Sequence, residues 1–203
     1  MDRLPAIGVA LALGLGMGTG CDESPREKEQ QAAAAEGPSR FVAVADKDEG
    51  RSPEAFCDAY TPGEDAEGFE APPLAGDGSF PSDGWRWINV WATWCKPCIE
   101  EMPVLAEWKQ KLHDEGAEFD LVFLSVDETD ELIAEFRADH PQTPESHRLE
   151  SPDALPEFLG SVGLSDNTPI PVQIFVDPRD RVRCVRAGAV NPDDYSAIGK
   201  ILL

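Results

Sequence analysis

The sequence has few basic residues for its length. Of 203 residues, 17 are lysine or arginine and 39 are aspartate or glutamate, so the formal net charge at pH 7 is −22. A chain this acidic is repelled by the phosphate backbone of nucleic acids and by anionic lipid surfaces. The charge balance therefore argues against nucleic acid as a partner.

Cysteine and histidine are scarce as well. The three histidines are isolated from one another, and the five cysteines are Cys21, Cys57, Cys95, Cys98 and Cys184. Five unevenly spaced cysteines are too few for a small protein that is stapled by disulfides. A structural zinc site needs four ligands, usually in two closely spaced pairs, and this sequence has one such pair. We therefore expect no metal site.

Long uncharged runs are absent except in residues 4–20, which are rich in alanine, leucine and glycine. This run is shorter than the roughly 20 residues that span a bilayer, and it is typical of a signal peptide. The small residues before Cys21 resemble a lipobox, in which the peptide is cleaved before a cysteine that is then lipidated. We expect residues 1–20 to be a signal peptide and the exported protein to be a lipoprotein on the periplasmic side. An ordinary secretory peptide with a stray Cys21 is the alternative.

The next segments have little capacity to form a core. Residues 22–38 contain no aromatic residue and no periodic apolar face, so they cannot bury enough surface to offset chain entropy. We expect residues 21–50 to form a disordered acidic tether that carries the lipid anchor. Residues 51–80 hold many prolines and glycines and are expected to be a loop-like N-terminal extension. Its apolar residues, spaced so that they can anchor it on a folded core, are Phe56, Phe69 and Leu74.

The first regular elements surround the one closely spaced cysteine pair. Residues 85–92 are dense in aromatic and β-branched residues, which predicts a buried strand. After the pair, apolar residues recur at steps of three and four, which predicts an amphipathic helix. These apolar residues are Ile99, Met102, Leu105, Trp108 and Leu112. The pair therefore stands at the turn from a strand into a helix.

Two cysteines separated by two residues at a helix N-terminus favour thiol–disulfide chemistry. The free N–H groups and the positive end of the helix dipole stabilise a thiolate on Cys95, and Lys96 adds a positive charge. Cys95 is therefore the expected nucleophile, and Cys98 is expected to resolve the mixed disulfide. Pro97 fixes the backbone between them. A purely structural bridge is disfavoured because so short a loop stabilises little.

The motif around the pair resembles a known family. Residues 89–98 read Asn-Val-Trp-Ala-Thr-Trp-Cys-Lys-Pro-Cys and are followed by Glu101 and Pro103. This pattern resembles the TlpA-like or ResA-like thiol–disulfide oxidoreductases, and the resemblance extends over roughly residues 70–203. It implies an α/β protein with a thioredoxin-like fold, in which helices flank a central mixed sheet, with a central insertion.

The resemblance also implies a function. It implies a membrane-tethered enzyme that reduces disulfides of extracytoplasmic proteins, for example during the maturation of cytochrome c or of copper centres. Its partners would be protein disulfide substrates and a membrane electron donor, and its redox-active disulfide would need no cofactor. Cys95 and Cys98 would carry the reaction, within a motif formed by Trp94, Lys96 and Pro97.

Two more residues gain an expected role from the resemblance. The family has a cis-proline facing the active-site disulfide, and that position is Pro171. The alternative is that Pro169 or Pro171 merely opens an edge strand. Classical thioredoxins have a buried aspartate beneath the cysteine pair where this chain has Asn89, and related tethered proteins use a glutamate that corresponds to Glu101. Glu101 would then help to deprotonate Cys98, unless it is an ordinary solvated helix carboxylate.

The remaining sequence predicts the thioredoxin-like domain over residues 81–203. The predicted elements are a strand at 119–126, helices at 129–138 and 152–159, a hairpin of strands at 172–176 and 182–185, and a closing helix capped by Asn191. The insertion would cover roughly residues 138–167. Because leftover cysteines usually pair in an oxidising compartment, we expect a disulfide between Cys57 and Cys184 that fastens the extension to a strand.

Other functions fit parts of the sequence. A metal-handling or non-catalytic binding module on the same fold would bind copper or zinc without reducing insulin, but no histidine-rich or methionine-rich tract accompanies the cysteine pair. A thiol peroxidase would need a threonine or serine at helical spacing before its cysteine, and Thr93 is too close to Cys95. A basic cluster forms a candidate surface for a partner; its members are Arg179, Arg181, Arg183 and Arg186.

Overall fold

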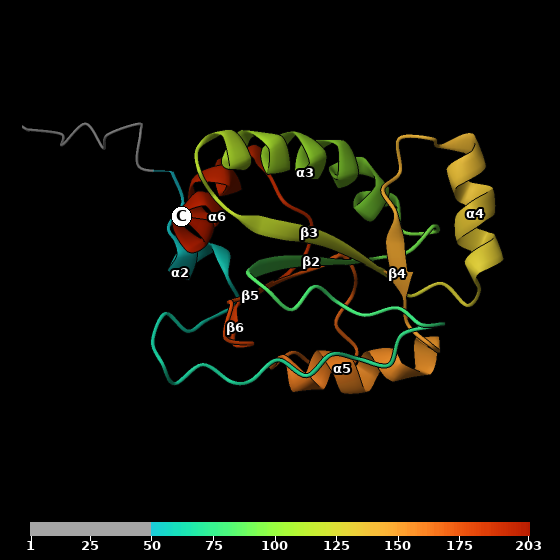
Figure 1. Cartoon of the computed structure of the whole chain (residues 1–203), viewed down its shortest axis with the longest axis horizontal. Coiled ribbons are helices and arrows are strands. Elements are labelled where there is room, and N and C mark those ends of the chain that lie inside the picture. Colours follow the sequence, from blue (N-terminus) through green and yellow to red (C-terminus); the bar gives the residue numbers. More distant parts are fainter. Residues whose placement is uncertain (1–49) are drawn as a thin grey trace, which may run out of the picture. The chain divides into compact units, whose positions relative to one another are not determined.

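The structure is a computed structural model that describes residues 50–203. Its six strands form one mixed sheet in the order β1-β6-β5-β2-β3-β4 (Figure 1). The strands are β1 (Ala59–Tyr60), β2 (Trp85–Trp91), β3 (Phe119–Ser125), β4 (Ser146–Arg148), β5 (Val172–Val176) and β6 (Val182–Ala187). The expected signal peptide, the lipidation site at Cys21 and the tether lie outside the described residues.

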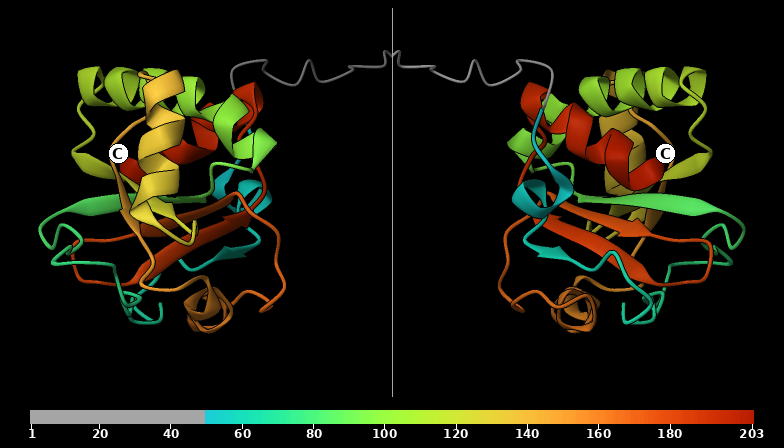
Figure 2. Two further views of the ribbon diagram at one scale, coloured as in Figure 1. Left: turned by 90° about the vertical axis from the view of Figure 1, so that its right-hand side faces the viewer. Right: turned by 90° about the vertical axis from the view of Figure 1, so that its left-hand side faces the viewer.

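The helices cover both faces of the sheet. They are α2 (Pro53–Phe56), α3 (Lys96–Asp114), α4 (Asp130–Asp139), α5 (Leu155–Ser161) and α6 (Tyr195–Leu202), with 3-10 turns η1 (Pro152–Ala154) and η2 (Pro192–Asp194). Helices α3 and α6 lie on one face and α5 on the other, whereas α4 lies beside the β4 edge (Figures 1 and 2). The expected fold class, a mixed sheet flanked by helices, is therefore confirmed.

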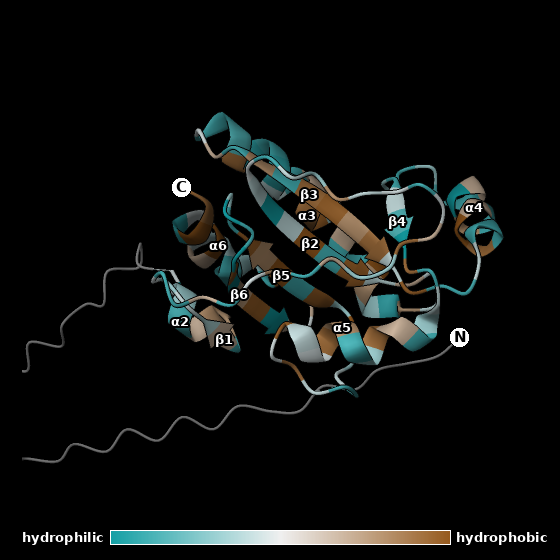
Figure 3. Ribbon diagram, turned by 60° about the horizontal axis from the view of Figure 1, so that its bottom comes forward, coloured by the Kyte–Doolittle hydropathy of each residue, from teal (hydrophilic) through white to brown (hydrophobic). Residues whose placement is uncertain are grey.

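The centre of the sheet is formed by β2, which runs parallel to β3 and antiparallel to β5. Six of its seven residues are buried, and all five residues of β5 are buried. Strands that are covered on both faces are apolar almost throughout, and hydrophobic residues are concentrated on the central strands in Figure 3. The end of β2 leads directly into the turn that begins α3, so this rigid core positions the cysteine pair.

The N-terminal extension is more regular than expected. The prediction of a loop was wrong for residues 53–60, because α2 and β1 form there and β1 pairs antiparallel with β6. Phe56 is fully buried, and Phe69 and Leu74 pack against the core as expected. A disulfide joins Cys57 to Cys184 on β6, with 5.5 Å between the Cα atoms. The extension is thus held by strand pairing, apolar burial and this disulfide together.

The basic cluster on and before β6 is engaged within the chain. Each of its four arginines has an acidic partner, and the pairs are Arg179 with Glu64, Arg181 with Asp177, Arg183 with Asp177, and Arg186 with Asp58. Arg183 also donates to the carbonyl oxygens of Pro62 and Gly63. The contacts to Glu64, Asp58, Pro62 and Gly63 tie the extension to the sheet edge, and part of the positive charge of the cluster is compensated within the chain.

The region of the expected insertion adds an edge strand. Residues of β4 pair in parallel with the end of β3, and the sequence did not indicate this strand because it is three polar residues long. Helix α4 lies close to its predicted range, and its Ile133 is buried while Leu132 is exposed. Asn191 and Asp194 form a capping box before the closing helix, as expected for this end of the chain. In the part of the chain that the structure describes, no helix is long and apolar enough to cross a membrane.

Candidate active site

The cysteine pair occupies the position that the motif predicted. Cys95 is the N-cap residue of α3 and Cys98 lies in its first turn, because the strand β2 ends four residues before Cys95 and Pro97 is compatible with a first helical turn. The two cysteines form a disulfide. Cys95 is 5% exposed and Cys98 is fully buried. The small exposed part of the pair therefore belongs to Cys95 and not to Cys98.

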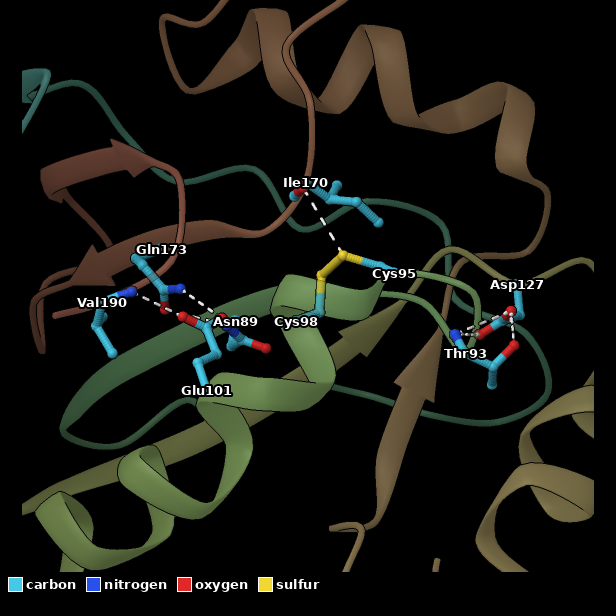
Figure 4. The surroundings of a disulfide bond; sticks show 9 residues. All are labelled: Asn89, Thr93, Cys95, Cys98, Glu101, Asp127, Ile170, Gln173 and Val190. Atoms are coloured by element: carbon cyan, nitrogen blue, oxygen red, sulfur yellow. Dashed lines mark hydrogen bonds between the residues drawn. A yellow bond between two sulfur atoms is a disulfide. The ribbon is translucent and has the colours of Figure 1, made fainter. Parts of the chain in front are cut away.

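The turn before β5 faces this disulfide. The Ile170–Pro171 peptide bond is cis, and the Ile170 carbonyl oxygen lies 3.8 Å from Cys95 Sγ (Figure 4). Strand β5 pairs with both β2 and β6, so Pro171 does not open an edge strand. The position of Pro171 agrees with the one that the resemblance implied. The turn at Pro171 places the backbone carbonyl of Ile170 beside the sulfur of Cys95.

Glu101 is buried on the inner side of α3. It is 3% exposed, so it is not a solvated helix carboxylate. Its Oε1 accepts hydrogen bonds from Asn89 Nδ2 at 2.7 Å and from Gln173 Nε2 at 3.0 Å, and its Oε2 accepts one from the Val190 amide at 2.8 Å (Figure 4). The carboxylate thus meets three N–H donors, each from a different segment of the chain.

The environment of Glu101 has two opposing effects on its acidity. Burial raises the pKa of Glu101 from 4.5 to about 7, against the hydrogen bonds from Val190, Asn89 and Gln173, which lower it. Burial dominates because the free energy lost when the charge leaves water exceeds the stabilisation that these hydrogen bonds give. A carboxyl group with this pKa exchanges its proton near neutral pH, one helical turn beyond Cys98.

A second buried carboxylate holds the turn that carries the motif. Asp127, which follows β3, is 1% exposed. It accepts hydrogen bonds from the Thr93 amide and from the Thr93 hydroxyl at 2.7 Å (Figure 4). Ser125 donates to the same carboxylate at 2.7 Å. Asp127 therefore fixes the backbone two residues before Cys95.

The outer surface of the site is apolar on one side and charged on the other. Trp94 is 69% exposed and lines a cavity of about 350 Å³ together with Val126, Leu155 and Ile170. Lys96 is exposed and forms an ion pair with Glu100 at 3.5 Å, a surface contact of little energetic weight. Ile170 is part of the lining of this apolar cavity, and its carbonyl oxygen lies 3.8 Å from Cys95 Sγ, so the cavity lies near Cys95.

Sequence reasoning missed Gln173 and the role of Asp127. Gln173 is a polar residue inside an apolar strand, and that interruption was the one signal in the sequence that it has buried partners. Asp127 follows a buried strand, but its contact with Thr93 depends on the pairing of β2 with β3. Among residues 50–203, no three side chains of the metal-binding types gather in one place.

Comparison with known proteins agrees with this geometry. Residues 86–179 match the family model described as Thioredoxin-like. The order of strands, the helix after the cysteine pair and the cis-proline beside it agree with that match. The described part of the chain therefore has a thioredoxin-like fold.

Its similarity to named proteins is more specific. The chain is 31% identical over 120 residues to the thiol-disulfide oxidoreductase ResA of Bacillus thuringiensis (strain Al Hakam), covering 58% of this chain and 60% of that protein. It is 26% identical over 129 residues to ResA of Bacillus subtilis (strain 168), covering 63% of each. The chain thus spans about three fifths of the length of these curated relatives. The resemblance to ResA-like proteins that the motif indicated is confirmed.

A solved structure supports the fold. The thiol:disulfide interchange protein of Chlorobium tepidum TLS, a thioredoxin family protein, matches with a TM-score of 0.50 and 24% identity. The match covers 68% of this chain and 98% of that one.

Proposed function

We propose that this chain is a thiol–disulfide oxidoreductase that reduces disulfides of other proteins through Cys95 and Cys98. The observation that carries the proposal is the placement of Cys95 at the N-terminus of α3, 3.8 Å from the Ile170 carbonyl oxygen. The helix N-terminus favours a thiolate on Cys95. The half-buried turn at Ile170 offers an extended substrate segment a partner for strand-like hydrogen bonds.

The reaction proceeds by two exchanges. In the reduced enzyme, the Cys95 thiolate attacks one sulfur of the substrate disulfide, forms a mixed disulfide and releases the other substrate sulfur as a thiolate. Cys98 then attacks the Cys95 sulfur, which forms the Cys95–Cys98 disulfide and releases the second substrate thiol. Two electrons pass from the enzyme to the substrate, and an external dithiol donor returns them.

Glu101 is suited to the second exchange. Cys98 is fully buried, so its thiol loses its proton to a group inside the protein more readily than to bulk water. A carboxylate with a pKa of about 7 accepts a proton near neutral pH. Glu101 therefore acts as the base for Cys98, either directly or through one water molecule.

The cellular setting of the proposal rests on the sequence. A signal peptide over residues 1–20, a lipid on Cys21 and the acidic tether over residues 21–50 would hold the domain on the periplasmic side of a membrane. A membrane electron donor would then re-reduce the pair. The substrates would be extracytoplasmic proteins whose cysteines must stay reduced, such as those that bind haem or copper.

The test is disulfide reduction by defined variants. The wild-type chain is expected to accelerate the reduction of insulin by dithiothreitol. Cys95→Ser should abolish this activity, and Cys98→Ser should accumulate a mixed disulfide that mass spectrometry detects on Cys95. The double variant Cys57→Ala/Cys184→Ala removes two cysteines outside the pair and should retain turnover. Turnover by Cys95→Ser would refute the mechanism, and stoichiometric copper binding without turnover would favour the metal-handling alternative.

A further inference from the structure

A row of polar side chains crosses the buried centre of the sheet. Asn89 on β2 lies opposite Gln173 on β5, which lies opposite Arg186 on β6. Asn89 and Gln173 are fully buried. Buried polar groups in a sheet are destabilising unless they are hydrogen-bonded. The hydrogen-bond partners of these side chains therefore indicate their role.

The amide of Gln173 has a defined orientation. Its Oε1 accepts hydrogen bonds from Trp87 Nε1 at 2.9 Å and from Asn89 Nδ2 at 3.1 Å. Because an indole N–H can only donate, the oxygen of Gln173 must face Trp87. The nitrogen of Gln173 must then face Glu101, to which it donates at 3.0 Å.

The geometry points to Gln173 as a positioning residue of the site: its amide holds one oxygen of the Glu101 carboxylate in place and favours the charged form. The significance of this role for catalysis rests on the proposed function. Gln173 contributes a donor and no acceptor to Glu101, and so do Asn89 and the Val190 amide. The O–H of a protonated Glu101 would meet only N–H groups, which cannot accept its hydrogen bond. The carboxylate, in contrast, accepts a hydrogen bond from each of the three donors.

Gln173 also links Glu101 to the turn that faces Cys95. It is the second residue of β5 and lies two residues after Pro171, which precedes the strand. A second connection runs through the neighbouring loop, where the Gly188 amide donates to the Pro171 carbonyl and the Val190 amide donates to Glu101. Both oxygens of the carboxylate are therefore held by segments that continue from the site of substrate approach.

Besides burial, the three donors set the acidity of Glu101, because the charged groups near this row are bonded or paired elsewhere. On α3, the titratable neighbour is Cys98, which is bonded to Cys95 in the oxidised protein. On β6, the guanidinium of Arg186 is directed to Asp58 at 3.8 Å and to the Phe56 carbonyl. Within residues 50–203, burial and hydrogen bonds shift the pKa of Glu101, and no charged side chain does.

The test follows the protonation of Glu101 directly. The infrared band of its carboxyl group is titrated in the oxidised full-length chain and assigned by its loss in Glu101→Gln. Gln173→Leu removes one donor, and the midpoint should rise by about one to two pKa units, the size expected for one hydrogen bond to a carboxylate. Gln173→Glu keeps the shape of the side chain and places a second carboxyl beside the first, so the midpoint should rise further.

A matched variant separates this role from packing. Ile174→Val trims the next residue of β5, which is also fully buried but points to the opposite face of the sheet, and it should leave the midpoint unchanged. Unchanged midpoints in both Gln173 variants, or an equal shift in Ile174→Val, would overturn the inference. The titration requires no turnover, so a chain that shows the shift but reduces no disulfide would refute the proposed function alone.

Discussion

Replacing Glu101 by glutamine should change how the stability of the protein depends on pH. The carboxyl group has a pKa of about 7 in the folded protein against an ordinary value of 4.5. It therefore binds its proton more tightly when the chain is folded. For such a group, folding stability is highest below the unfolded pKa and falls as the pH rises towards the folded pKa.

The size of the effect follows from the difference between the two pKa values. Each pKa unit corresponds to about 1.36 kcal/mol, so the full loss is about 3 kcal/mol. About 2 to 3 kcal/mol of this loss in stability occurs between about pH 5 and pH 8. Glutamine does not titrate, and its oxygen can still accept from Asn89 and Gln173. Its NH2 group would face the Val190 amide, which costs about 1 to 3 kcal/mol at every pH.

The assay is urea denaturation of the oxidised wild-type and Glu101→Gln chains, followed by tryptophan fluorescence at several pH values. Both disulfides remain closed, so Cys95 and Cys98 do not titrate. The free energy of unfolding of the variant minus that of the wild type should rise by about 2 to 3 kcal/mol from about pH 5 to pH 8. Glu100→Gln removes an exposed carboxylate from the same helix, and its difference should change far less. A flat difference for Glu101→Gln would refute the reasoning.

The remaining predictions concern the supports of the site. Cys57→Ala/Cys184→Ala opens a link between residues 127 apart, and the free energy of unfolding should fall by about 4 to 5 kcal/mol; separate alkylation of the two cysteines in the non-reduced protein would show that the link is absent. Asp127→Ala deprives the Thr93 amide of its buried acceptor and should lower stability by about 1 to 3 kcal/mol and slow insulin reduction, whereas unchanged rates would show that this contact does not position Cys95. Trp94→Ala should leave the free energy of unfolding within about 0.5 kcal/mol but raise KM for a peptide disulfide, and an unchanged KM would exclude the cavity beside Trp94 from substrate binding.

The local elements of the site were predictable from the sequence. The apolar density of β2 and the spacing of apolar residues in α3 are short-range signals, so the turn that carries Cys95 and Cys98 follows from a few adjacent residues. The expectation of a link between Cys57 and Cys184 required no contact information, because it came from counting the cysteines of a chain that was expected to be exported to an oxidising compartment.

The contacts between distant segments were not predictable in the same way. Strand β1 has two residues, Ala59 and Tyr60, and forms because β6 offers it an edge and Phe56 is buried beside it. The network around Glu101 depends on the register that places Asn89 opposite Gln173. A single sequence gives no register, so the choice between a buried and a solvated Glu101 stayed open until the sheet was known.

The measurement that tests the central proposal most directly is the reduction potential of the Cys95–Cys98 pair. The full-length chain is equilibrated with defined ratios of reduced and oxidised dithiothreitol or glutathione, and the two thiols are counted by alkylation and mass spectrometry. An enzyme that reduces other proteins should have a potential closer to the value of about −270 mV of thioredoxin than to the value of about −120 mV of a strong periplasmic oxidant. A potential near −120 mV would contradict the account, because the pair would then accept electrons from its substrates.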